Sequence, residues 1–310
     1  MKKFLVIGNP IEHSLSPKLH NYWIRKNNID AIYEKKLLEE NELEILCNEV
    51  REGKIEGFNV TVPFKEKIIK YMDTLSEDAS NSKAVNTVYK VSKNGEYKLI
   101  GDNTDIYGFK KSVPTLVHAA EGGSCGAIIL GAGGASRAII IALGHLGINT
   151  FAIINRTKNR ATKLMQEIDP ENYDPELIYN WCKDEDRMSM IKSKIIVNCT
   201  SLGLKKDDKI PLDFLKYKNN TLSKNIIFYD LIYNPAETDF LKRAKEIGQE
   251  AINGKMMFVY QAQQSFKRWH NVLPDVNQEV VDLLDDSSIN LYTVKEGDDL
   301  FIPEMNNVVY

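Results

Sequence analysis

The 310-residue sequence is poor in the features that mark secreted, membrane and nucleic-acid-binding proteins. Its four cysteines form no C-x-x-C pair and stand apart in apolar contexts, which favours reduced cytosolic thiols over disulfides. No stretch approaches the roughly 20 apolar residues of a membrane-spanning helix. A net charge of −3 lacks the basic surplus of a general nucleic-acid or anionic-membrane binder. By elimination, we expect a cytoplasmic protein that binds neither nucleic acid nor membrane.

The start of the chain briefly resembles a targeting signal. Residues 1–8 carry two lysines and then an apolar run, but that run is short and meets Asn9 and Pro10 at once. We interpret this segment as a first strand.

Strand-like apolar runs alternate with helical patterns along the chain, without an internal repeat or a low-complexity tract. This alternation predicts an α/β protein with largely parallel sheets, and the length suffices for two domains. In the first third we expect strands at 4–8, 32–38, 57–61, 84–91 and 97–101, the last two forming a hairpin across Asn94-Gly95, and helices at 18–27, 41–51 and 66–71. Beyond a break in the pattern at 118–126 we expect strands at 127–130, 150–154, 194–198 and 226–231, and helices at 136–147, 158–167 and 256–269.

The stretch Gly131-Ala-Gly-Gly-Ala-Ser136 follows a predicted buried strand and opens a helix, the arrangement that cradles a dinucleotide pyrophosphate. Gly131 permits the tight turn, and Gly133 lets the backbone approach phosphate. The free N–H groups at the start of the helix attract the anion. The predicted cofactor contacts here are Gly131, Ala132, Gly133, Gly134 and Ala135.

The next predicted strand runs into Asn155, Arg156 and Thr157, at the place where an NAD site usually carries an acidic residue. Arg156 offers a fork-shaped cation that suits a 2′-phosphate, and Arg160 follows one helical turn later. NADP(H) is therefore the expected cofactor. The predicted site comprises Asn155, Arg156, Thr157 and Arg160, with further contacts at Thr200, Leu231 and Gly254.

Two hydroxyl side chains alternate in a loop near the N-terminus. Residues two apart in an extended segment point the same way, so Ser14 and Ser16 could grip one carboxylate together. The alternative is that Ser16 caps the helix that Pro17 begins.

Lys65 follows a strand that ends at Thr61 and a turn at Pro63. Most lysines are solvated surface charges, but the carboxyl ends of strands are where α/β proteins form substrate crevices. An ammonium at that place could donate a proton to a carbonyl oxygen as hydride arrives at carbon.

Polar residues gather in two further places. In Gly101-Asp-Asn-Thr-Asp105, Asp105 fits a helix cap with an Asx turn, which leaves Asp102 unexplained at a strand end. Gln261 stands four residues beyond Met257, on one face of a predicted helix, as a cleft-lining amide would.

Together these residues resemble the shikimate dehydrogenase family over residues 1 to about 285. The motifs that carry the resemblance stand in the family's order and spacing: His13-Ser-Leu-Ser-Pro17, Asn59-Val-Thr-Val-Pro-Phe-Lys65, Ala84-Val-Asn-Thr87, Gly101-Asp-Asn-Thr-Asp105, Gly131-Ala-Gly-Gly-Ala-Ser136, Asn155-Arg-Thr157 and Gln261-Ala262.

The resemblance implies a substrate-binding and catalytic domain at 1–118, completed by 255–286, and a Rossmann-type NADP-binding domain at 119–254. The tail at 287–310 and the polar segment 168–192 have no assigned role. The implied reaction is the reversible, NADPH-dependent reduction of 3-dehydroshikimate to shikimate in aromatic amino-acid biosynthesis, by a monomer or homodimer without a metal.

The resemblance also implies roles for individual residues. Ser14 and Ser16 would hold the ring carboxylate. The ring hydroxyls would be read by four residues, namely Thr61, Asn86, Asp102 and Gln261, while Tyr233 closes over the substrate. Lys65 and Asp102 would form the catalytic pair.

Two alternatives remain at this point. The length of the chain is similar to that of quinate/shikimate dehydrogenases, some of which use NAD, although those often carry an acidic residue where Thr157 and Lys158 stand here. A nucleotide-sensing regulator on the same fold is the more distant alternative, and the presence of Lys65 and Asp102 disfavours it.

Overall fold

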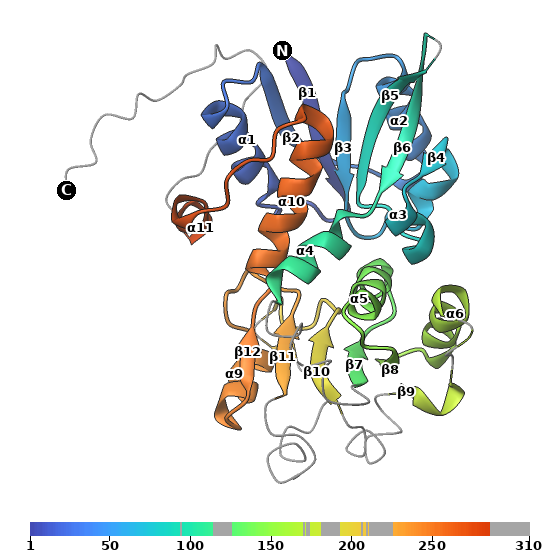
Figure 1. The fold of residues 1–310 in the computed structure, drawn as a ribbon, viewed down its shortest axis with the longest axis vertical. Helices are drawn as coiled ribbons and strands as arrows, with labels where there is room; N and C mark the ends of the chain where they lie inside the picture. The colour runs from blue at the N-terminus through green and yellow to red at the C-terminus, as the bar shows by residue number, and fades with distance from the viewer. Residues whose placement is uncertain are drawn as a thin grey trace, which may run out of the picture.

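The computed structural model of the chain describes residues 1–93, 95–113, 126–169, 171, 174–180, 193–205, 207, 208, 210 and 226–285. The expected domain boundary at 118–119, most of the segment 168–192 and the tail 287–310 lie outside the described residues. The chain forms two six-stranded sheets, one above the other, with helices packed around each of them (Figure 1).

The first sheet has the strand order β2-β1-β3-β5-β6-β4. Its strands are β1 (Lys2–Gly8), β2 (Ala31–Leu37), β3 (Gly57–Val60), β4 (Thr74–Leu75), β5 (Thr87–Lys93) and β6 (Glu96–Asp102). The β1 strand runs parallel to β2 and β3, whereas β5 is antiparallel to both β3 and β6. The expected hairpin is therefore confirmed. The β4 strand is parallel to β6, so parallel pairings are the majority in this sheet, as expected.

The helices of this part differ from the expected ones in detail. They are α1 (Ser16–Lys26), η1 (Glu40–Glu42), α2 (Leu43–Arg51), η2 (Lys67–Tyr71), α3 (Glu77–Ser82) and α4 (Thr104–Ser112). The expected helix at 41–51 splits into a 3₁₀ turn and an α-helix, and the one at 66–71 is a 3₁₀ helix. Neither α3 nor the two-residue β4 was expected, because both are too short to show a period.

The second sheet is wholly parallel, in the order β12-β11-β10-β7-β8-β9. Its strands are β7 (Gly126–Leu130), β8 (Thr150–Asn155), β9 (Ile178–Asn180), β10 (Ser193–Asn198), β11 (Ile227–Asp230) and β12 (Glu250–Ile252). The elements packed with them are α5 (Gly134–His145), α6 (Lys158–Ile168), η4 (Pro175–Leu177) and α9 (Asp239–Glu246). Buried Ile, Val and Leu fill its strands, as a sheet covered on both faces requires.

The long helix α10 (Lys255–His270) leaves the second sheet and packs against the first (Figure 1). Its apolar residues, among them Phe258 and Phe266, join a buried cluster with Phe4 and Trp23. The short helix α11 (Gln278–Asp285) follows and contacts α1. Within the described residues, no helix is both long and apolar enough to cross a bilayer.

Candidate active site

The expected polar loops meet at one edge of the first sheet. The β1 and β3 strands are parallel and end together at Gly8 and Val60, and β5 begins there at Thr87, opposite the end of β6. The serine loop, the turn before Lys65 and the start of α4 therefore lie side by side. A Cβ on Gly8 would reach within 2.5 Å of the Thr61 methyl carbon, so a glycine is needed where these loops cross.

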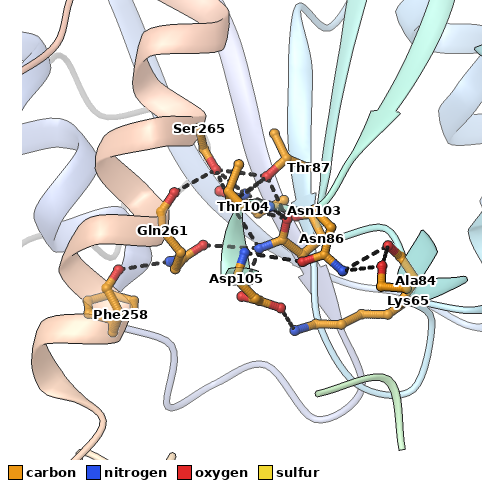
Figure 2. A network of polar contacts seen from close by, with 12 residues as sticks. Lys65, Ala84, Asn86, Thr87, Asn103, Thr104, Asp105, Phe258, Gln261 and Ser265 are labelled. Atoms are coloured by element: carbon orange, nitrogen blue, oxygen red, sulfur yellow. Dashed lines mark hydrogen bonds and ion pairs between the residues drawn. The ribbon is translucent and has the colours of Figure 1, made fainter. Parts of the chain in front are cut away.

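Lys65 is fixed at both its backbone and its side chain. The backbone N–H of Phe64 donates to Thr61 O, closing the turn, and Val85 N donates to Lys65 O at 2.8 Å. The Lys65 ammonium donates to the Asp105 carboxylate at 2.6 Å, and both side chains are largely buried (Figure 2). The second carboxylate oxygen of Asp105 accepts from Asn86 Nδ2 at 2.8 Å.

The expected pairing of Lys65 with Asp102 is wrong. Asn103 is the N-cap of α4 and accepts from the backbone N–H of Asp105, which leaves the Asp105 carboxylate to face the lysine. Asp102 instead accepts from Ser76 Oγ at 2.5 Å, from Asn103 N at 2.8 Å and from Arg268 Nε at 2.8 Å. Its side chain is 3% exposed, with both carboxylate oxygens engaged by protein donors. Neither the catalytic role nor the substrate-reading role that we expected for Asp102 fits this position.

Asn86 and Gln261 lie beside the Lys65–Asp105 pair. Asn86 Nδ2 is 3.3 Å from Gln261 Oε1, and Gln261 Nε2 donates to Phe258 O at 3.0 Å (Figure 2). The two helices that carry Asp105 and Gln261, α4 and α10, contact each other closely at Gly108, where a Cβ would lie 2.6 Å from Met257 O.

The serine loop runs directly into α1. Ser16 is the first residue of that helix, and the N-cap position is Leu15. The alternative expectation that Ser16 caps the helix is therefore wrong. Ser14 Oγ accepts from the backbone N–H of Ser16 at 3.3 Å. Tyr33 is buried behind the loop, and its hydroxyl bonds with Ser16 and donates to Asn59 Oδ1 at 2.7 Å.

Tyr233, from the loop after β11, reaches across to the serine loop. Its ring stacks on Phe258 with centroids 4.6 Å apart, and its hydroxyl bonds with the backbone of Leu15. Burial raises the pKa of Tyr233 to about 12, so the hydroxyl stays protonated. The second half of the chain thus contributes a side chain to the polar edge of the first.

The glycine loop has the shape that a pyrophosphate requires. Gly131 has φ = +104°, a conformation that side chains resist, and α5 begins at Gly134, where the first N–H groups of a helix have no partner within the helix. A Cβ on Gly133 would meet no atom within 4 Å, so the loop surface is open to a ligand. A Cβ on Gly134 would lie 3.1 Å from Lys65 Cβ, so the loop directly adjoins the lysine.

The remaining expected cofactor residues lie at or after the ends of β8, β10, β11 and β12, strands of the same sheet as β7. Asn155 ends β8 and donates to Thr157 O, and the side chains of Arg156, Thr157 and Arg160 are exposed. Thr200 adjoins Gly131, while Gly254 lies so close to Leu231 O that a Cβ would overlap it.

Asp230 supports the loops that carry Thr200 and Leu231. Its carboxylate accepts from Asn198 Nδ2 and Thr238 Oγ1 and from the backbone N–H of Ile232. Asn198 Oδ1 in turn accepts from Thr200. Burial raises the pKa of Asp230 to about 6 despite these donors.

Several residues of the polar edge were not expected. They are Asp105 as the partner of Lys65, Asn59 in the middle of β3, Thr87 and Thr104, and Ser265 on α10. Two of them carried a signal in the sequence. Asn59 is a polar residue inside an apolar strand, and Ser265 stands four residues after Gln261 on the same helix face.

A parallel sheet with a glycine turn, adjoining a buried lysine–aspartate pair at the edge of a second sheet, defines a two-domain dinucleotide-dependent oxidoreductase. Residues 6–88 match the family model described as the shikimate dehydrogenase substrate binding domain. The shikimate dehydrogenase (NADP(+)) of Pelagibacter ubique is 48% identical over 285 residues, which are 92% of this chain and 99% of that protein. The chain belongs to the shikimate dehydrogenase family.

Solved structures agree with this assignment. Shikimate dehydrogenase from Aquifex aeolicus superimposes with a TM-score of 0.75 at 35% identity, covering 92% of this chain and 98% of that one. The Thermus thermophilus shikimate 5-dehydrogenase, solved in complex with NADP(H) and shikimate, gives a TM-score of 0.72 at 30% identity, again over 92% and 98%.

Proposed function

We propose that the polar edge of the first sheet is the active site of an NADP-dependent shikimate dehydrogenase, with Lys65 and Asp105 as its acid–base pair. The chain is an oxidoreductase that interconverts 3-dehydroshikimate and shikimate. The observation that carries the residue assignment is the 2.6 Å contact between two mostly buried, oppositely charged groups beside the glycine loop.

Each residue of the pair has a distinct task in this proposal. NADPH, when bound, supplies the hydride that the ketone carbon accepts. The Lys65 ammonium donates a proton to the ketone oxygen as it becomes a hydroxyl, and takes that proton back in the reverse direction. Asp105 orients the ammonium directly, and its second carboxylate oxygen accepts from Asn86.

The substrate is a small anionic polyol, and the polar edge offers matching groups. Ser14 and Ser16 stand at the start of α1, where hydroxyls and N–H groups suit the ring carboxylate. Asn86, Gln261 and Thr61 would read the ring hydroxyls. Tyr233 would cover the substrate from the side of the second sheet.

Replacement of Lys65 tests the acid–base role. We expect Lys65→Ala to lower kcat by at least about 10²-fold, because it removes the proposed proton donor, while shikimate still binds. Lys67→Ala is the control, since Lys67 is exposed and pairs with Glu40. Steady-state kinetics and shikimate titration would measure both effects. Near-normal turnover by Lys65→Ala would refute the role.

Arg156 and Arg160 are proposed to hold the 2′-phosphate of NADP(H), since both side chains are exposed after β8 on the same sheet as the glycine loop. We expect Arg156→Asp to raise the KM for NADPH roughly 10- to 100-fold, with little change for NADH, because it removes a charge-assisted hydrogen bond to phosphate. Lys158→Asp makes the same charge change two residues away and should leave the preference intact. An unchanged ratio of kcat/KM for the two cofactors in Arg156→Asp would contradict the clamp.

The quinate/shikimate alternative is not favoured, since the curated relatives are named as NADP(+) shikimate dehydrogenases. We further propose that residues 1–118 and 255–286 form the catalytic domain and 119–254 the cofactor domain, and that the enzyme works in the cytoplasm as a monomer or homodimer. The packing of α10 against α4 and α1 supports the first of these proposals. Sedimentation at several concentrations would measure the oligomeric state.

A further inference from the structure

Ser265 carries a buried hydroxyl group that has no role in the proposed reaction. It lies on α10, four residues after Gln261, and is fully buried. Its side chain points from the helix toward Thr87 and Thr104 (Figure 2). A serine at that depth needs hydrogen-bond partners, because an unpaired buried hydroxyl is costly.

Its partners form a triangle of three hydroxyl groups from three elements. Ser265 Oγ is 2.8 Å from Thr87 Oγ1 on β5 and 3.1 Å from Thr104 Oγ1 on α4, and these two threonine oxygens are 3.1 Å apart. All three side chains are buried. The triangle therefore fixes α10, α4 and β5 relative to one another at a single point.

Amide groups complete the hydrogen bonding around the triangle. Asn59 Nδ2 donates to both Ser265 Oγ and Thr87 Oγ1 at 3.0 Å, and Ser265 Oγ donates to Gln261 O at 3.1 Å. Asn86 Oδ1 accepts from Thr87 Oγ1 at 3.0 Å and from Thr104 N at 2.8 Å. Each hydroxyl thus has both donor and acceptor neighbours, the condition under which such networks hold side chains rigidly.

The arrangement determines which way Asn86 faces. Its oxygen accepts from both threonines, and its Nδ2, which also donates to Thr104 Oγ1 at 3.0 Å, is thereby directed at Asp105 and Gln261. Ser265 itself contacts neither Lys65 nor Asp105 in the described hydrogen bonds. It reaches the site through Asn86 and through the backbone of Gln261.

We propose that Ser265, with Thr87 and Thr104, is a positioning residue that sets the orientation of the Asn86 and Gln261 amides and thereby the recognition of the substrate ring. The inference rests on the proposed function of those two amides. It predicts that loss of the Ser265 hydroxyl weakens binding of the shikimate ring while leaving the Lys65–Asp105 pair able to transfer the proton.

The test is Ser265→Ala, measured by steady-state kinetics with both substrates. We expect the KM for shikimate to rise about tenfold, kcat to stay within about twofold and the KM for NADP⁺ to stay unchanged. Ser112→Ala is the matched control. Ser112 is also buried on a helix, and its Oγ also bonds with a backbone carbonyl, Phe109 O, and with a second hydroxyl, that of Tyr229. This control should lose stability without any change in the KM for shikimate.

Thr87→Val gives a second reading should Ser265→Ala not fold, because it removes a hydroxyl of the same triangle and keeps the side-chain shape. It should raise the KM for shikimate in the same way. Wild-type KM in both variants, or a kcat that falls in proportion to kcat/KM, would overturn the positioning role. Turnover of shikimate by the wild-type protein in the same assay tests the proposed function separately. Failure of the positioning role is therefore distinguishable from failure of the proposed function.

Discussion

Asp102 and Asp105 stand three positions apart, and their carboxylates accept from different cations and different polar groups. Asp102 is surrounded by donors from α3, α4 and α10, including the Arg268 guanidinium. Asp105 meets an ammonium and an amide at the polar edge. Asn103 lies between the two aspartates and is the N-cap of α4. Its side chain accepts from Asp105 N, so the chain turns into the helix between Asp102 and Asp105.

Replacing each aspartate by asparagine should separate the two roles. Asp105→Asn removes the charge that orients Lys65, and we expect kcat to fall by about 10²-fold or more with a small change in stability. Asp102→Asn places an NH₂ group among donors, so we expect a loss of about 1–3 kcal/mol in the free energy of unfolding. Its kcat should remain near wild type. Chemical denaturation and steady-state kinetics measure the two quantities. A large loss of kcat in Asp102→Asn alone would favour Asp102, and not Asp105, as the catalytic partner of Lys65.

At the scale of secondary-structure elements, the site depends on how closely α4 and α10 approach. Their contact is made at Gly108, where a Cβ would lie 2.6 Å from Met257 O and 2.9 Å from Gln261 N. These are backbone atoms, so they cannot move aside without shifting the helix. Since α4 carries Asp105 and α10 carries Gln261, the spacing of the two helices sets the width of the site.

Gly108→Ala is therefore expected to push α10 away from α4. We expect it to destabilise the fold by about 1–3 kcal/mol and to raise the KM for shikimate, despite the better helix propensity of alanine. Gly144→Ala is the control within α5, because a Cβ there would meet nothing closer than 3.9 Å. That variant should be neutral or stabilised in thermal unfolding. A stabilised Gly108→Ala with unchanged KM would show that the helices do not rely on this contact.

Sequence patterns predicted most elements of the two sheets, because long apolar strands and the glycine turn have strong local signals. They missed the short strands β4, β9 and β12 and the helices α3, α9 and α11, which have six to eight residues each. They also assigned Asp102 rather than Asp105 to Lys65, since a cap and a catalytic acid look alike until the backbone shows that Asn103 is the cap. The hydroxyl triangle joins residues 87, 104 and 265, and no local pattern can indicate that α10 returns to β5.

At the scale of the whole molecule, burial shifts the pKa of two histidines near the first sheet and of one aspartate near the second sheet in opposite directions. Near the first sheet, burial lowers the pKa of His20 well below its usual value and that of His270 to about 4. Near the second sheet, burial raises the pKa of Asp230 to about 6. A lowered histidine pKa means that the unfolded chain takes up the proton first as the pH falls, whereas a raised aspartate pKa means that the folded chain does.

These signs predict that mild acid acts on the two parts in opposite directions: the histidine contribution weakens the part around the first sheet, and the Asp230 contribution stabilises the part around the second. The histidine contribution is present above about pH 6.5 and is lost as the pH falls toward about 4. The Asp230 contribution is present below about pH 4 and is lost as the pH rises through about 6. We therefore expect hydrogen exchange at pH 5 to show β1 losing protection relative to β7, compared with pH 7.5. His270→Phe should reduce that loss, and equal changes in β1 and β7 would contradict the assignment.

The near-contact between Gly134 and Lys65 has a kinetic meaning beyond packing. Hydride transfer depends steeply on distance. In the proposed mechanism, residue 134 lies between the loop that would face the cofactor and the side chain that would donate the proton. A methyl group at residue 134 would press on the Lys65 side chain before it reached either the cofactor or the substrate. The absence of a side chain at Gly134 would thus keep the sites of the proposed hydride transfer and proton transfer close to one another.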